Sequence, residues 1–148
     1  MTPLDLTLGP PRPCRAELDG IIFLPRAIDK VRAALPGGNL GLYLNLSPDV
    51  ATLSSLFYRR MGITHDEFSA AVAEAADEAA VAAWLRARID ERAVEKFTQQ
   101  LLGLKLGGLP EDGRQTVHEL YRGAASAPDD TLLIDLIDAD DAALFARS

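Results

Sequence analysis

The sequence predicts an all-α fold, a single compact domain of six or seven short helices over residues 17–148, preceded by an extended proline-rich arm over residues 1–16. Three observations predict it. Apolar residues recur with helical period along most of the chain, several such segments begin at helix-capping residues, and no convincing strand pair is evident. The length of 148 residues is that of one domain.

The arm is predicted to be extended because proline lacks a backbone donor and restricts the residue before it. It contains four prolines, namely Pro3, Pro10, Pro11 and Pro13. The first helix is expected over about residues 24–35, with Pro25 in its first turn and Gly37 and Gly38 after its end. Apolar residues there are spaced by three and four and form one stripe, which consists of Leu24, Ile28, Val31 and Leu35.

Capping residues predict where the next three helices begin. Ser47 is expected to cap a second helix, with Pro48 at its first position and an end at Gly62. Thr64 and Glu67 form a capping-box pattern that opens a third helix. Asp77 is expected to cap a fourth, and residues 39–46 are expected to form a short extended connector.

The second half of the chain is expected to add helices at about 91–102 and 113–123. Residues 131–137 are short, apolar and ambiguous between strand and helix, and helix is favoured because no partner strand is predicted. A last short helix is expected from Asp138 to Phe145. The large aromatic residues are interpreted as core residues, and these are Tyr43, Phe68, Trp84 and Phe97, with Trp84→Ala expected to be the costliest truncation.

Composition and charge exclude several function classes. The formal charge is −7, with +2 over residues 1–62 and −9 over residues 63–148, so nucleic acid is not an expected partner. No apolar run reaches the roughly 18 residues of a transmembrane span, and the first residues lack the pattern of a secretory signal, so a cytoplasmic protein without membrane contact is predicted. The lone Cys14 excludes an internal disulfide and a cysteine-built zinc site, and no metal or cofactor is expected.

The best candidate site is the charged face of the first helix. Arg26, Asp29 and Lys30 fall within about 100° of one another, opposite the apolar stripe. One interpretation is a solvated face. The other is that these residues, with Arg12 of the arm and Arg32, bind a carboxylate or phosphate.

Lys30 would have a lowered pKa if it were buried beside Arg26 and Arg32, as a general base or a nucleophile requires. Lys30 and Asp29 are therefore the candidates for acid–base catalysis. We expect Asp29, together with Asp19 or Glu17, to offset part of the positive charge, and an exogenous anion to complete the site.

Two further groups receive simpler interpretations. The acidic residues Asp135, Asp138, Asp140 and Asp141 are expected to complement the dipole at a helix start, and they lack the pattern of a calcium loop. The pKa of the Cys14 thiol is expected to be lowered by the neighbouring Arg12 and Arg15, although the sequence shows no base beside it.

The segment Leu18-Asp-Gly-Ile-Ile-Phe-Leu-Pro-Arg-Ala-Ile-Asp-Lys-Val-Arg-Ala33 resembles the signature of an uncharacterised bacterial family, a domain of unknown function of about this length. Other matching features run from Pro11-Arg-Pro13 to Asp135–Asp141, although Leu132-Leu133 stand where an aromatic residue precedes the acidic motif in relatives. The resemblance implies a cytoplasmic single-domain protein and no particular reaction. Carried over residue by residue, it marks Arg26, Asp29, Lys30, Arg32 and Tyr43 as the positions to test.

Three functions are compatible with these patterns. The favoured one is a binding module for an anionic small molecule or an acidic partner, with Arg26, Lys30, Arg32, Arg12 and Tyr43 as ligand-binding residues. The second is a small enzyme that uses Lys30 or Asp29 for acid–base chemistry on an anionic substrate. The third is a non-catalytic structural or stress-related protein whose alanine-rich helices associate into a homo-oligomer.

Overall fold

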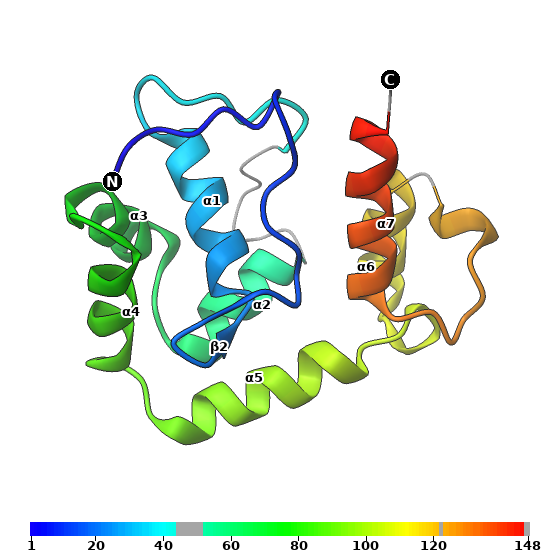
Figure 1. The fold of residues 1–148 in the computed structure, drawn as a ribbon. Coiled ribbons are helices and arrows are strands. Elements are labelled where there is room, and N and C mark those ends of the chain that lie inside the picture. The colour runs from blue at the N-terminus through cyan, green and yellow to red at the C-terminus, as the bar shows by residue number, and fades with distance from the viewer. Residues whose placement is uncertain (44–51, 122, 147–148) are drawn as a thin grey trace.

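The computed structural model describes residues 1–43, 52–121 and 123–146, and seven α-helices within these ranges confirm the all-α prediction (Figure 1). They are α1 (Leu24–Ala34), α2 (Leu53–Met61), α3 (His65–Glu74), α4 (Glu78–Arg86), α5 (Glu91–Gly103), α6 (Glu111–Leu120) and α7 (Leu133–Phe145). The first four helices form one group, α6 and α7 a second, and α5 runs along the base of both (Figure 1). No described helix has the length and apolar character needed to cross a membrane.

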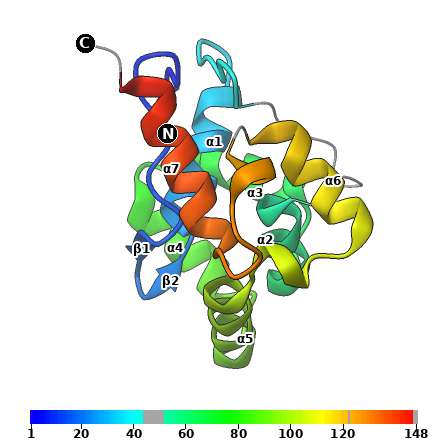
Figure 2. The ribbon, with the colours of Figure 1, turned by 90° about the vertical axis from the view of Figure 1, so that its right-hand side faces the viewer.

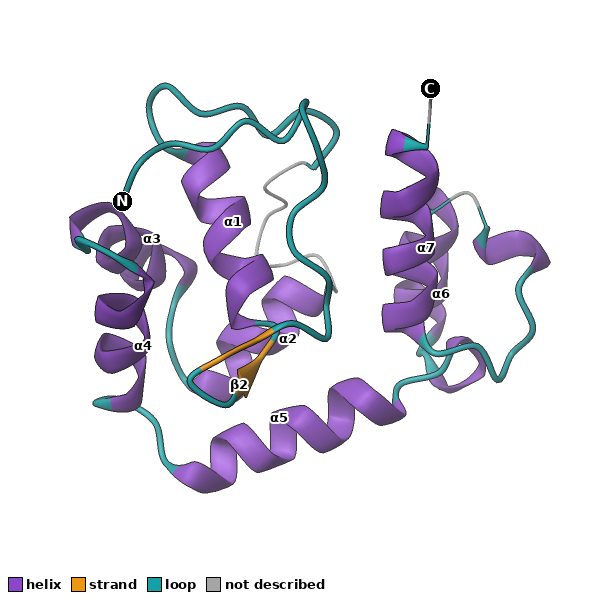
Figure 3. Ribbon diagram, viewed as in Figure 1, coloured by secondary structure: helices purple, strands orange, loops and turns teal. Residues whose placement is uncertain are grey.

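A small hairpin precedes α1 and was not expected from the sequence (Figure 3). β1 (Glu17–Leu18) pairs antiparallel with β2 (Ile21–Ile22) across a two-residue turn. Both turn residues have positive φ, 52° at Asp19 and 73° at Gly20, which is the conformation that Asp-Gly turns favour. The hairpin buries Ile21 and Ile22 and leads the chain directly into α1.

Helix α1 confirms the expected boundaries and shows a strained start. Phe23 lies immediately before it in a left-handed conformation, with φ of 74°, which costs an L-residue about 1–2 kcal/mol. The Phe23 side chain is fully buried between Phe57 and Phe97, with ring centroids 5.7 and 6.0 Å away. Burial of this large ring offsets the backbone strain.

The capping predictions hold for two helices and fail for one. Thr64 and Glu67 form the expected capping box of α3, and Asp77 accepts a hydrogen bond from the Ala80 backbone at the start of α4. Helix α2 instead begins at Leu53 with Thr52 as its cap. The predicted cap Ser47, with Pro48, lies outside the described residues, as do residues 44–46 of the expected connector.

The C-terminal helices differ from prediction in their boundaries. Helix α6 ends at Leu120, three residues before the expected end. The predicted helix at 131–137 is confirmed from Leu133 onward, but it continues through Asp138 to Phe145 as one helix, α7. The predicted break at Asp138 is therefore wrong, because Ile134 and Ile137 are buried on a face that continues past it.

The aromatic core has Phe57 at its centre, with Phe23, Phe68 and Phe97 at centroid distances of 5.4 to 5.9 Å. All four rings are fully buried. Trp84 is only partly buried, since it lies at the edge of α4 with the Arg88 guanidinium 4.2 Å from the ring centroid. Trp84 packs against the edge of the core without being fully enclosed, whereas the prediction that Tyr43 is a core residue is wrong, because Tyr43 lines a cavity instead.

The arm runs along α1 and is hydrogen-bonded to it and to the loop that follows. The Leu4 backbone N–H donates to the Arg32 carbonyl, the Leu6 N–H donates to the Asn39 carbonyl at 2.8 Å, and the Asn39 N–H donates to the Leu4 carbonyl at 3.0 Å. Figure 1 shows the arm passing between α1 and α7, and Figure 2 shows it running alongside α7. The arm therefore brings its arginines to the charged face of α1.

Candidate functional site

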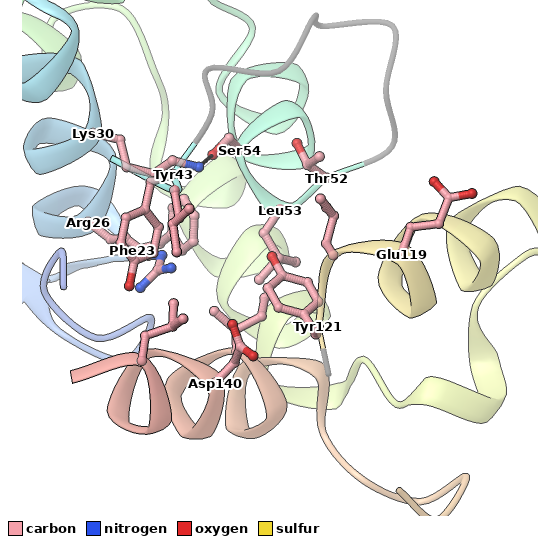
Figure 4. A pocket seen from close by; sticks show the side chains of 14 residues that line it. Phe23, Arg26, Lys30, Tyr43, Thr52, Leu53, Ser54, Glu119, Tyr121 and Asp140 are labelled. Atoms are coloured by element: carbon pink, nitrogen blue, oxygen red, sulfur yellow. Dashed lines mark hydrogen bonds between the residues drawn. The ribbon is translucent and has the colours of Figure 1, made fainter. Parts of the chain in front are cut away.

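A cavity of about 290 Å³ lies between α1, the start of α2, the end of α6 and α7. Its polar lining consists mainly of Arg26 and Lys30 of α1, Tyr43, Ser54 of α2, Tyr121 and Asp140 of α7 (Figure 4). This volume is close to the lower end of small-molecule sites, about 300 Å³. The cavity thus has room for a small metabolite.

Lys30 is half-buried at the edge of this cavity. Its Nζ donates to Oγ of Ser54 at 3.3 Å, and within the described ranges no carboxylate lies within ion-pair distance of it. Burial lowers the pKa of the Lys30 amine to about 8, and the nearby Arg26 cation adds to this effect. A good fraction of this amine is therefore neutral at mildly alkaline pH.

Arg26 is buried rather than solvated, with only 4% of its surface exposed. Its Nη1 lies 2.6 Å from Oδ2 of Asp141, and the Tyr43 hydroxyl donates to the other oxygen of that carboxylate at 2.8 Å. The same Nη1 donates to the Arg12 carbonyl at 3.3 Å. The interpretation of a solvated face is therefore wrong for Arg26.

Asp29, also only 5% exposed, binds the arm and does not line the cavity. Its carboxylate accepts from the Arg12 backbone at 2.8 Å and from Nε and Nη2 of Arg12 at 3.0 and 2.9 Å. Arg12 also pairs with Glu78 of α4. Asp29 thus positions the arm, and nothing in its contacts favours a catalytic role.

Arg32 lies away from the cavity, where its guanidinium donates to the carbonyl and hydroxyl oxygens of Thr2 at 2.9 and 3.0 Å. The candidate residues therefore divide into two groups. Arg26, Lys30 and Tyr43 meet at the cavity, whereas Arg12 and Arg32 hold the arm.

The charges of Arg12 and Arg26 are offset from within the chain. Asp29 pairs with Arg12 and Asp141 with Arg26, while Asp19, one of the carboxylates expected there, pairs with Arg86. An exogenous anion is therefore not needed to balance Arg12 and Arg26. Lys30 differs from Arg12 and Arg26, because the partner that the described part of the chain supplies for its ammonium group is the Ser54 hydroxyl and not a carboxylate.

Three acidic residues of α7 bind the arm and α1, and these contacts were not predicted from the sequence. Asp135 pairs with Arg15, Asp138 accepts from the Cys14 backbone at 3.0 Å, and Asp141 binds Arg26. Asp135 lies in the first turn of α7, as expected for a residue that complements the helix dipole, whereas Asp138, Asp140 and Asp141 lie farther along the helix, so the interpretation is wrong for these three. The spacing of three residues places Asp135, Asp138 and Asp141 on one helix face, and this spacing was the available signal.

Cys14 is completely buried, and burial raises the pKa of its thiol to about 12. The expectation of a lowered pKa is wrong because the side chains of Arg12 and Arg15 are occupied by carboxylates and desolvation dominates. Cys14 is an unreactive core residue. Over the described residues, no group of three or more His, Cys, Asp or Glu side chains is arranged to hold a metal ion.

Fold and cavity together define a small, mostly helical protein with a lysine at the edge of a cavity. The chain belongs to the family described as Domain of unknown function (DUF5069), whose sequence profile matches residues 9–143. This confirms the resemblance to an uncharacterised family. No curated protein matches the chain.

Proposed function

We propose that this protein is a binding module for a small anionic molecule, which it holds in the cavity with the Lys30 side chain as the main positive charge. The observation that carries the proposal is the Lys30 ammonium group, which sits half-buried against a cavity and receives only the Ser54 hydroxyl from the described residues. A desolvated cation without a carboxylate gains most from an anionic ligand.

The opposite side of the cavity defines the rest of the ligand. Tyr121 and Asp140 lie there, across from Lys30 and Ser54 (Figure 4). Burial raises the pKa of the Tyr121 phenol to about 12, so this group stays protonated and can donate a hydrogen bond. A ligand with an acid group at one end and hydroxyl groups at the other fits this lining.

Localisation in the cytoplasm is part of the proposal. The chain has one cysteine, which is buried with a protonated thiol. A single reduced cysteine is compatible with a reducing compartment such as the cytoplasm, where disulfides are rare. The negative formal charge of −7 argues against nucleic acid as the partner.

Thermal unfolding in the presence of phosphate, sulfate, acetate and citrate at constant ionic strength tests the proposal. A ligand at 100 times its Kd stabilises the folded state by about 2.7 kcal/mol. For a chain of this length that corresponds to a rise in Tm of roughly 5–10 °C. We expect at least one of these anions to raise the Tm of the wild type in this way.

Lys30→Met should remove the rise, since it deletes the charge and keeps an apolar chain of similar size. Lys96→Met is the matched control, because Lys96 is exposed on α5 and loses the same charge without touching the cavity. Equal shifts in the wild type and in both variants would show that the anions act on the general surface charge, and the proposal would then be wrong.

A further inference from the structure

We propose that Lys30 also reacts covalently, as an amine nucleophile that forms an imine with an aldehyde or ketone carrying an acid group. This inference rests on the proposed anion site and names the substrate class for it. Lys30 Nζ borders a cavity large enough for a small carbonyl compound, and its known partner is a neutral hydroxyl 3.3 Å away. A lysine held by a carboxylate would have to give up an ion pair before it could attack.

The electrostatic surroundings keep the amine reactive. The described ionisable groups around Lys30 are on several elements, namely Arg26 on the same helix, Cys14 of the arm, Tyr43, Glu119 at the end of α6, Tyr121, and Asp140 and Asp141 on α7. Asp141 is engaged by Arg26 and Tyr43, so its charge is largely offset. Burial and the Arg26 cation therefore dominate and lower the pKa of the Lys30 amine to about 8.

The reaction balances without an added oxidant or reductant. The nitrogen lone pair of Lys30 forms a bond to the carbonyl carbon, and the carbonyl oxygen takes up the proton that the nitrogen releases. The resulting carbinolamine expels this oxygen as water, with one proton supplied by a neighbouring acid, and leaves a protonated imine, whose nitrogen returns one proton to that acid when the neutral imine forms. Ser54 and Tyr121 line the cavity as hydroxyl groups available for these proton transfers.

The chain offers its own internal references, because it has only three lysines, Lys30, Lys96 and Lys105. Lys96 and Lys105 are both exposed. At pH 7 about one in ten amines with a pKa near 8 is neutral, against roughly one in three thousand for an ordinary lysine. Allowing for the lower nucleophilicity of a weaker base, we expect Lys30 to react at least about tenfold faster.

The experiment uses the full chain with glyoxylate, an aldehyde that carries a carboxylate, and propionaldehyde, which is neutral. Sodium cyanoborohydride traps each imine as a stable amine, and peptide mass spectrometry measures the modified fraction of each lysine over time. The ratio of Lys30 to Lys96 modification removes the intrinsic difference between the two aldehydes. We expect this ratio to be ten or more with glyoxylate and clearly smaller with propionaldehyde.

The outcomes separate this inference from the proposed binding function. A ratio near one with both aldehydes overturns the nucleophile, even where phosphate or another anion stabilises the protein through Lys30. Equal ratios of ten or more with both aldehydes overturn the acidic substrate class. Lys30→Arg checks the assignment, because it keeps the positive charge and must lose the adduct while Lys96 and Lys105 still react.

Discussion

Replacing Lys30 with Met is expected to stabilise the protein at neutral pH and to have little effect on stability near pH 10.5. The folded state lowers the pKa of Lys30 from 10.5 to about 8. Between these values the unfolded chain holds a proton that the folded chain does not, so the Lys30 contribution to the free energy of unfolding rises with pH. Below pH 8 both states hold the proton, and the folded state bears the full cost of the partly buried charge.

The magnitude follows from the difference between the two pKa values. It corresponds to about 3 kcal/mol at 1.36 kcal/mol per pKa unit. Lys30 is half-buried, so solvent screening reduces the expected difference to about 2 kcal/mol. Lys30→Met should therefore be more stable than the wild type by about 2 kcal/mol at pH 7.

Urea denaturation at pH 7, 8, 9 and 10 measures this difference. Comparing the two proteins at each pH is essential because Cys14 titrates with the opposite sign. Its thiol pKa is raised from 9.0 to about 12, so the folded state retains a proton above pH 9 and stability falls there. The difference between wild type and variant removes this contribution.

Lys96→Met serves as the control and should show no such change with pH, since Lys96 is exposed. A Lys30→Met variant that is less stable than the wild type at pH 7 would refute the reasoning. So would a difference that stays constant from pH 7 to 10. Either result would mean that the folded protein compensates the Lys30 charge.

Three further predictions concern stability and are measured by chemical denaturation. Asp141→Ala should cost about 3–5 kcal/mol because it leaves the Arg26 charge buried and unpaired, and a loss below 1 kcal/mol would contradict this. Phe57→Ala should cost about 3–5 kcal/mol and clearly more than Trp84→Ala. A larger loss of stability for Trp84→Ala would contradict a core centred on Phe57. Gly38→Ala should also destabilise, since its Cβ would lie 2.5 Å from a carbonyl oxygen at the end of α1, and unchanged stability would show that this turn yields readily.

Local signals predicted helix starts well wherever the capping partner lies within a few residues. The boxes and caps at Thr64 and Asp77 formed as predicted because their hydrogen bonds close over three residues. The hairpin was missed although its signal was present, since Asp19-Gly20 between apolar residues is typical of a two-residue turn. A strand pair this short contributes little periodicity, so only the turn chemistry could have revealed it.

The candidate site was only half predictable. The helical period correctly placed Arg26, Asp29 and Lys30 on one face of α1, and Lys30 and Arg26 do line the cavity. The helical period of the sequence could not predict which other segments of the chain pack against that face of α1. The partner of Arg26 is 115 residues away along the chain, and the partner of Asp29 is Arg12 of the arm, 17 residues away.

The sequence by itself determined the helices, their apolar stripes and the grouping of charges on α1, because these depend on contacts within one or two turns. Only the tertiary structure decided which of those charges are buried, which are paired and which one faces the cavity. The packing of α7 and the arm against α1 determines the burial and the ion pairs of these charges, since desolvation and ion pairing depend on groups that are distant in the chain. Arg26 and Lys30 are neighbours on one helix, yet α7 gives a carboxylate to the first and the described structure leaves the second at the cavity with a hydroxyl.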